Sequence, residues 1–405
     1  MLPLETKAAI TGLTSPLLVK LAGLPELAEG QFPLERMALD LRSVPRHAMT
    51  PELLDLRWGA LVGAQPLADN APDSLLSQAW SSGRPMAALQ GDSAIAKPGD
   101  VLELDPYRQR AAVRYRRGDN GNVLFATERC NSYCLMCSQP PRQVEDDWRV
   151  QHLCDLVDLI DGTEPSLAIS GGEPTLLGDG LATVVAKCSE RLPDTHVHVL
   201  SNGRLLGDVD LADRFEGLHR HLTWGIPLYG DHYALHDYVV QSEGAFAQTL
   251  RGLYALDAAR QRIEIRVVLV KPSLERLEAL VRFILRNLPF VEHVALMGIE
   301  PIGFAKAHHA ALWADPADYT AQIQGAVDAL SRRGTDVSLY NLPLCTIPES
   351  LWPFARQSIS NWKNDYLDAC SSCAVKHRCS GFFSWVTPQW TSRAIIPIEL
   401  DLEAA

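Results

Sequence analysis

The chain has 405 residues, 47% of them hydrophobic, and a formal net charge of −12 at pH 7. This length allows one large hydrophobic core with one or two smaller domains. The acidic charge argues against a nucleic-acid partner, and no apolar run is long enough to cross a membrane. Because the first twelve residues lack the apolar stretch of a signal peptide, we expect a cytoplasmic protein whose cysteines stay reduced.

Residues 1–118 contain no cysteine and no motif that assigns a role. Near the end of this region, two runs at residues 101–104 and 112–115 flank an Asp-Pro turn signal and predict a β-hairpin. The same stretch is the most basic part of the chain and holds Arg108, Arg110, Arg114, Arg116 and Arg117. A solvated hairpin face is the simpler interpretation. The alternative is a docking surface for an acidic peptide or a redox partner.

From residue 122 onward, short apolar runs alternate with amphipathic helical patterns at 148–160 and 273–288. This alternation indicates an α/β fold with parallel strands and right-handed crossovers. Six strands are predicted, at residues 123–126, 167–170, 196–201, 222–228, 263–270 and 291–297. The alternation ends after about residue 303, and the sequence therefore divides into a region at 1–118, a core at 119–310 and a C-terminal domain at 311–405.

Three cysteines follow the first predicted strand at C-x3-C-x2-C spacing: Cys130, Cys134 and Cys137. Such a compact loop can direct three thiolates to one iron–sulfur cluster. Three protein ligands leave one iron of a [4Fe–4S] cluster open, which is typical of a site that binds substrate. A structural zinc site needs a fourth ligand, and the next Cys or His is only His152. Cys154 and Cys188 stand alone in helical patterns, and we expect them to be buried, inert thiols.

The second predicted strand ends at Ser170 and continues into Gly171, Gly172, Glu173 and Pro174. Two glycines allow the backbone to approach a ligand closely, and a glutamate offers a carboxylate to a cation. An ordinary strand-to-helix turn is the simpler interpretation of such a segment taken alone. Its place one strand after the cysteines favours a binding site, because chemistry in parallel barrels lies at the carboxyl ends of strands.

Together, the cysteine loop and the Gly-Gly-Glu-Pro segment resemble the radical S-adenosylmethionine (SAM) superfamily. The resemblance implies an open, partial (β/α)6 barrel in which the three cysteines hold a [4Fe–4S] cluster and SAM chelates the fourth iron. It also implies that Glu173 binds the ammonium group of SAM. Further SAM contacts are implied for Met136, which replaces a usual aromatic residue, for Ser201 and Asn202 near the ribose, and for Arg266 near the carboxylate. The segment 298–303 would form the adenine edge.

A second group of cysteines lies near the C-terminus and consists of Cys345, Cys370, Cys373 and Cys379. The C-x2-C-x5-C part of this group resembles the SPASM and Twitch domains that follow some radical SAM cores. A full SPASM domain has about seven cysteines, so four thiolates indicate one auxiliary [4Fe–4S] cluster. Zinc remains the alternative, since it also accepts four thiolates.

The residues around the cysteine loop, at 127–142, are similar to those of the His-Xaa-Ser system radical SAM maturases, of the HxsC type. The segments 340–345 and 379–383 support this resemblance. It implies a precursor peptide with His-Xaa-Ser repeats as substrate, a second radical SAM maturase as partner, and an electron donor such as flavodoxin or ferredoxin. The alternatives are a radical SAM enzyme that acts on a sulfatase or a small molecule, or a non-catalytic iron–sulfur protein for electron transfer or redox sensing.

Overall fold

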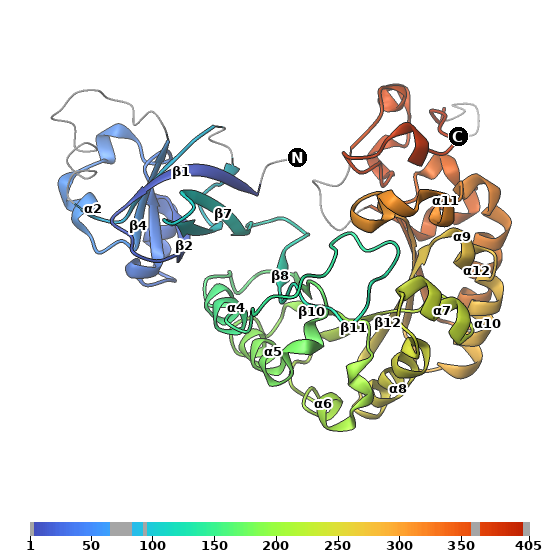
Figure 1. Ribbon diagram of the computed structural model, residues 1–405. Helices are drawn as coiled ribbons and strands as arrows, with labels where there is room; N and C mark the ends of the chain where they lie inside the picture. The colour runs from blue at the N-terminus through green and yellow to red at the C-terminus, as the bar shows by residue number, and fades with distance from the viewer. Residues whose placement is uncertain (1–3, 65–82, 92–94, 358–364, 400–405) are drawn as a thin grey trace.

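The computed structural model of the chain describes residues 4–64, 83–91, 95–357 and 365–399. The N-terminal region forms a small β-barrel, and an open parallel sheet with helices on its outer side follows it in the chain (Figure 1). The cysteine-rich C-terminal segment packs beside the last strands of this sheet. The predicted α/β class with a partial parallel barrel is confirmed.

The N-terminal barrel closes in the strand order β1-β5-β4-β3-β2-β6-β7 over the residues that the structure describes there. Strands β2 to β5 pair in parallel, whereas β1, β6 and β7 pair antiparallel with their neighbours. The elements are β1 (Glu5–Thr11), β2 (Leu17–Ala22), α1 (Leu24–Glu29), β3 (Met37–Asp40), α2 (Pro51–Asp55), β4 (Ala60–Ala64), β5 (Met86–Leu89), β6 (Val101–Asp105) and β7 (Arg110–Tyr115).

The predicted hairpin is confirmed as β6 and β7, in which Glu103 lies opposite Ala112. Side chains of a strand alternate between its two faces, and buried Leu102 and Leu104 flank the partly exposed Glu103. Alanine, valine and leucine side chains from all seven strands fill the interior. The barrel is therefore a packed core.

The core is an eight-stranded sheet in the order β15-β14-β13-β12-β11-β10-β9-β8, and every neighbouring pair is parallel. The six predicted strands are all present. They are β8 (Val123–Phe125), β9 (Ser166–Ser170), β10 (His196–Leu200), β11 (Leu222–Pro227), β12 (Arg262–Leu269) and β13 (His293–Gly298). The sheet continues past residue 310 with β14 (Asp336–Tyr340) and β15 (Ala355–Arg356).

Amphipathic helices cover the outer face of this sheet (Figure 1). The predicted helix at 273–288 is two helices, because α9 ends at Leu274 and α10 begins at Leu277. The helices are α4 (Arg149–Val157), α5 (Asp179–Arg191), α6 (Val209–Asp213), α7 (Tyr233–Val240), α8 (Ala245–Ala258), α9 (Lys271–Leu274), α10 (Leu277–Asn287), α11 (His309–Leu312) and α12 (Thr320–Arg332). Among the helices of the described residues, none has the length and apolar character that a membrane span requires.

Buried ion pairs join the N-terminal barrel to the core. Lys20 of β2 is fully buried, and its Nζ lies 2.9 Å from Asp161 Oδ1 and donates to the carbonyl of Leu159. Arg117 also pairs with Asp161, and the Tyr115 hydroxyl donates to Glu164 at 2.6 Å. Removing one partner of a buried pair costs about 3–5 kcal/mol. These contacts therefore fix the barrel against the edge of the core that carries the cysteine loop.

Candidate functional site

The cysteine loop follows β8 at the carboxyl end of the sheet. The end of α7 holds one side of it, since Tyr133 and Leu135 donate their amide protons to the carbonyls of Val240 and Val239. On the other side, the amide of Phe304 donates to the carbonyl of Cys137 at 2.9 Å. The loop is thus held by the backbones of two segments distant in sequence.

Burial and neighbouring charges raise the pKa values of the three thiols in this loop. Burial raises the pKa of Cys130 to about 11, and the nearby Glu173 carboxylate adds to this effect. Burial together with the thiols of Cys137 and Cys130 raises the pKa of Cys134 to about 12. Burial also raises the pKa of Cys137. A bound metal cation lowers the pKa of the thiols that coordinate it, because a coordinating thiol is deprotonated outright.

Gly171 and Gly172 bring the end of β9 against the segment that leads into the cysteine loop. A Cβ at either position would collide with backbone oxygens of Thr127 or Arg129. Gly171 also has φ of 142°, which favours glycine. The amides of Gly172 and Glu173 donate to the carbonyls of Thr127 and Arg129 at 2.7 and 2.8 Å. In this structure, the two glycines allow the end of β9 to pack closely against the backbone of Thr127 and Arg129.

The Glu173 carboxylate is only 1% exposed and accepts four hydrogen bonds. Its Oε1 accepts from the amide and the hydroxyl of Thr175 and from the Ser201 hydroxyl at 2.7 Å. Its Oε2 accepts from the Asn202 amide at 2.7 Å. Pro174 begins the 3-10 turn that follows, a position that suits its missing N–H. Glu173 therefore ties the end of β9 to the end of β10, directly beside Cys130.

Asn202 connects this pair of strand ends to the cysteine loop, since its Nδ2 donates to Asn131 Oδ1 at 2.6 Å. Arg204 makes a second connection that we did not predict. Its guanidinium donates to the Asn131 carbonyl, to Ser132 Oγ and to Gln248 Oε1. Its place two residues beyond the predicted Asn202 puts Arg204 near the site, but the sequence carries no signal of these contacts.

Arg266 lies on the inner face of β12, which β11 separates from β10 and its Glu173 contacts in the sheet order. Its Nη1 is 3.0 Å from Glu264 Oε1, and His293 Nδ1 is 2.7 Å from Glu264 Oε2. The second ring nitrogen of His293 is 3.0 Å from the Ser338 hydroxyl. Burial raises the pKa of Glu264, but His293 and Arg266 outweigh burial and lower it. We did not predict this polar chain on the inner face, although Glu264 and Arg266 alternate with apolar residues in the sequence.

Met136 and the predicted adenine segment lie in one apolar cluster. Met136 is buried there with Ile299 and Trp390. Gly303 turns over the cysteine loop with φ of 60°, and a Cβ there would collide with the Cys137 carbonyl. The structure thus brings Met136 and the segment 298–303 together, and it places both at the cysteine loop.

The four C-terminal cysteines line a single cavity, although 24 residues separate the first two. Amides point at two of their sulfurs: Leu344 and Gly381 donate to Cys379 Sγ at 3.4 and 3.5 Å, and Ile398 donates to Cys373 Sγ at 3.4 Å. Such hydrogen bonds are a usual means of tuning cluster thiolates.

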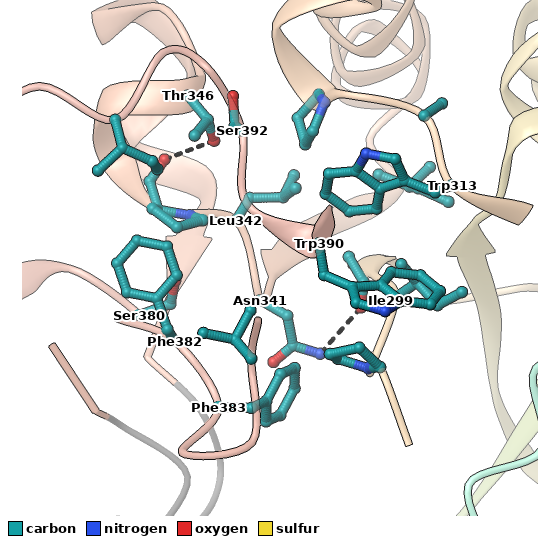
Figure 2. Close-up of a pocket in the computed structure, with 18 of the residues that line it drawn as sticks. Ile299, Trp313, Asn341, Leu342, Thr346, Ser380, Phe382, Phe383, Trp390 and Ser392 are labelled. Carbon is teal, nitrogen blue, oxygen red and sulfur yellow. Dashed lines mark hydrogen bonds between the residues drawn. The ribbon is translucent and has the colours of Figure 1, made fainter. Parts of the chain in front are cut away.

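Figure 2 shows a second, aromatic pocket between this segment and the ends of β13 and β14. Trp313 and Trp390 line it with ring centroids 5.6 Å apart, and Phe382 and Phe383 face them from the loop after Cys379. Asn341, whose φ of 58° is left-handed, donates to the Gly298 carbonyl at the pocket floor. The pocket adjoins the cavity of the C-terminal cysteines, since Pro343, Phe382 and Ile395 line both.

The donor sets fit iron–sulfur clusters by their chemistry. Within the described residues, no group of three or more Cys, His, Asp or Glu side chains has the arrangement of a site for a single metal ion. Each thiolate of a [4Fe–4S] cluster binds a different iron, so cluster ligands need not converge on one point. Three thiols in one loop and four thiols around one cavity are therefore compatible with binding one [4Fe–4S] cluster each.

No family model matches the chain, and no curated protein matches it. It is similar to the solved structure of Streptococcus suis SuiB bound to S-adenosylmethionine, with 18% identity over 56% of this chain and a TM-score of 0.43. It is also similar to anSMEcpe with bound AdoMet and Kp18Cys peptide, with 17% identity over 54% of this chain, 62% of that chain and a TM-score of 0.43. A domain of a pyruvate-formate lyase-activating enzyme from Bacteroides vulgatus gives 15% identity over 43% of this chain, 98% of that domain and a TM-score of 0.35. The chain spans about half of SuiB, with 52% covered.

Proposed function

We propose that the chain is a radical SAM enzyme that modifies a partner peptide. The observation that carries this proposal is the placement of three thiols in one loop beside the buried Glu173, at the carboxyl ends of adjacent parallel strands. Cys130, Cys134 and Cys137 would hold a [4Fe–4S] cluster. When cluster and SAM are bound, they supply reductive cleavage of SAM and hydrogen abstraction by a 5′-deoxyadenosyl radical.

The residues around the thiols would bind and orient SAM. Among the residues that the structure describes, the Oε2 of Glu173 accepts one hydrogen bond, from Asn202, and it would accept another from the SAM ammonium group. Ser201 and Asn202 would reach the ribose, and Met136 would pack against the adenine. Arg266 would meet the SAM carboxylate with the N–H groups that Glu264 leaves free. Gly171, Gly172 and Pro174 set the backbone that carries Glu173.

The C-terminal cysteines would hold one auxiliary [4Fe–4S] cluster. Support comes from their shared cavity and from the amides that point at Cys373 and Cys379. An auxiliary cluster offers an acceptor for the electron that an oxidised or crosslinked peptide must lose. The proposed substrate is a precursor peptide with His-Xaa-Ser repeats, processed with a second radical SAM maturase and supplied with electrons by flavodoxin or ferredoxin.

Co-expression with candidate precursor peptides tests this proposal. We expect mass spectrometry to find peptide that has lost two hydrogen atoms, and we expect this change to disappear in the Cys130→Ala variant. Cys154→Ala is the matched control, because Cys154 is a buried thiol of α4 outside both groups. Unmodified His-Xaa-Ser peptide beside an enzyme that cleaves SAM would contradict the substrate. Modification that survives Cys130→Ala would contradict the site.

A further inference from the structure

β8 is an edge strand of the core sheet and lies next to the N-terminal barrel (Figure 1). In the part of the chain that the structure describes, its ladder partner is β9 alone. An edge strand presents unpaired backbone groups that can pair with another extended chain. The free side of β8 is therefore a place where a peptide can add as a strand.

The hydrogen bonds to β9 determine which groups of β8 face outward. Ala168 of β9 donates to the Asn122 carbonyl at 3.1 Å, and Ala126 donates to the Ser170 carbonyl at 2.7 Å. In a parallel ladder, alternate residues of a strand direct their N–H and C=O groups to the same side. Asn122 and Ala126 bond to β9, so the intervening Val123 and Phe125 direct their backbone groups to the opposite, free side. Their amides and carbonyls face away from β9.

A groove of about 570 Å³ runs along this free edge. Val123 and Phe125 line it together with Trp148 and Arg149, which begin α4. The Arg149 guanidinium lies 4.9 Å from the Phe125 ring centroid and 4.8 Å from that of Trp148. Val123 is 41% exposed and Trp148 is 56% exposed, which is unusual for large apolar side chains. The groove thus offers apolar contacts beside unpaired backbone groups.

The exposed charge of Arg108 favours an acidic occupant. Four arginines line the groove in a chain whose net charge is −12, namely Arg108, Arg114, Arg116 and Arg149. Three of them are paired within the chain, since Arg114 contacts Glu103, Arg116 contacts Asp100 and Arg149 contacts Glu128. Arg108 has an 80% exposed side chain, and its ion pair with Asp105 is long, at 3.8 Å. Its charge is therefore available to a ligand.

We propose that this groove binds an extended, acidic segment of the peptide substrate as an additional strand on β8. The proposal rests on the proposed peptide-modifying function. It explains how a bound peptide reaches the chemistry, because β8 leads directly into the cysteine loop and Gln139, two residues after Cys137, also lines the groove. Backbone pairing at Val123 and Phe125 sets the register, and the exposed Arg108 selects an acidic side chain.

Hydrogen exchange on the anaerobically reconstituted protein, without SAM, tests strand addition. The probe is a synthetic peptide of alternating glutamate and valine. We expect it to slow exchange of the Val123 and Phe125 amides about tenfold or more, because exchange then requires opening of new hydrogen bonds. Leu124 is the internal control, since its amide faces β9. Equal protection by a peptide N-methylated at alternate residues, or no protection by the unmodified peptide, would overturn the proposal.

Charge reversal tests the selectivity. We expect Arg108→Glu to weaken binding of the glutamate–valine peptide and to strengthen binding of a lysine–valine peptide. Arg282→Glu, on an exposed position of α10, is the matched control and should change neither affinity. Unchanged affinities would overturn the charge argument. A reversal that slows reduction by flavodoxin but leaves peptide affinities unchanged would assign the groove to the electron donor instead. SAM cleavage without peptide is measured separately. Normal SAM cleavage without peptide binding would contradict only the groove proposal, whereas absent SAM cleavage would contradict the proposed function.

Discussion

Substitutions of Glu173 distinguish its contribution to the stability of the protein from its contribution to SAM binding. Glu173→Ala removes the acceptor of four buried hydrogen bonds, from Thr175, Ser201 and Asn202. Each buried donor left unsatisfied costs about 1 kcal/mol or more, so we expect a loss of about 4 kcal/mol in the free energy of unfolding. Glu173→Gln keeps an acceptor at Oε1 and loses the bond from the Asn202 amide. We therefore expect a loss of only about 1–3 kcal/mol for this variant.

The two variants should differ in stability but should lose a similar part of their affinity for SAM. If the negative charge binds the ammonium group, both variants lose a charge-assisted hydrogen bond of about 1.5–3 kcal/mol. The Kd for SAM should then rise about tenfold to a hundredfold in both. Thr175→Val is the matched control. It removes one hydrogen bond to Glu173 and keeps the charge, so it should lower stability while leaving SAM affinity unchanged.

Urea denaturation and equilibrium dialysis with SAM measure the two quantities, and iron content is determined for each variant. A Glu173→Gln protein that binds SAM as tightly as the parent protein would refute the assignment of Glu173 to the ammonium group. A Glu173→Ala protein as stable as the parent would refute the calculation from the four hydrogen bonds.

Three further predictions concern the clusters and the N-terminal barrel. Reconstituted protein should bind about eight iron atoms, and replacing Cys130, Cys134 and Cys137 by alanine should remove about half of them; zinc in the remaining site, found by elemental analysis, would contradict the auxiliary cluster. Cys373→Ala should form 5′-deoxyadenosine but no modified peptide, because the substrate radical must still lose an electron; normal amounts of modified peptide from soluble variant protein without its second cluster would remove the electron-acceptor role. Burial raises the pKa of Glu103, but His152 and Arg114 outweigh burial and lower it to about 2 from 4.5. The ionised carboxylate therefore stabilises the protein above pH 4.5, and this contribution disappears as the pH falls toward 2. Glu103→Gln should destabilise the protein at pH 7 and much less at pH 3, and an equal effect in urea denaturation at both pH values would contradict the pairing.

The repeating core could be predicted from the sequence because its signals are local. Each apolar run of the core is a buried parallel strand, and the pattern at 273–288 buries Leu280, Val281 and Ile284 of α10. The pairing of β14 with β13 could not be predicted, since the crossover through α12 carries no residue-level signal of which sheet the next strand joins. The two-residue β15 is too short to give any pattern.

Most strands of the N-terminal barrel could not be predicted from the sequence. Its strands β3 and β5 are four-residue runs that are buried throughout, so neither alternation nor length distinguishes them from loops or helix segments. Only the hairpin of β6 and β7 had a turn signal. In the site, the spacing of the cysteines and the Gly-Gly-Glu-Pro segment after the second strand made the cysteines and Glu173 candidates. The contacts of Arg204 depend on a fold that brings together residues more than 70 positions apart, which one sequence does not reveal.

Formation of 5′-deoxyadenosine from SAM tests the proposed function most directly. Anaerobically reconstituted protein, reduced with dithionite, should produce 5′-deoxyadenosine and methionine, slowly even without peptide. The variant in which alanine replaces Cys130, Cys134 and Cys137 should produce none, while Cys154→Ala should retain the activity. Reconstituted protein that holds its iron and leaves SAM intact would contradict the account, and so would equal product from the triple variant.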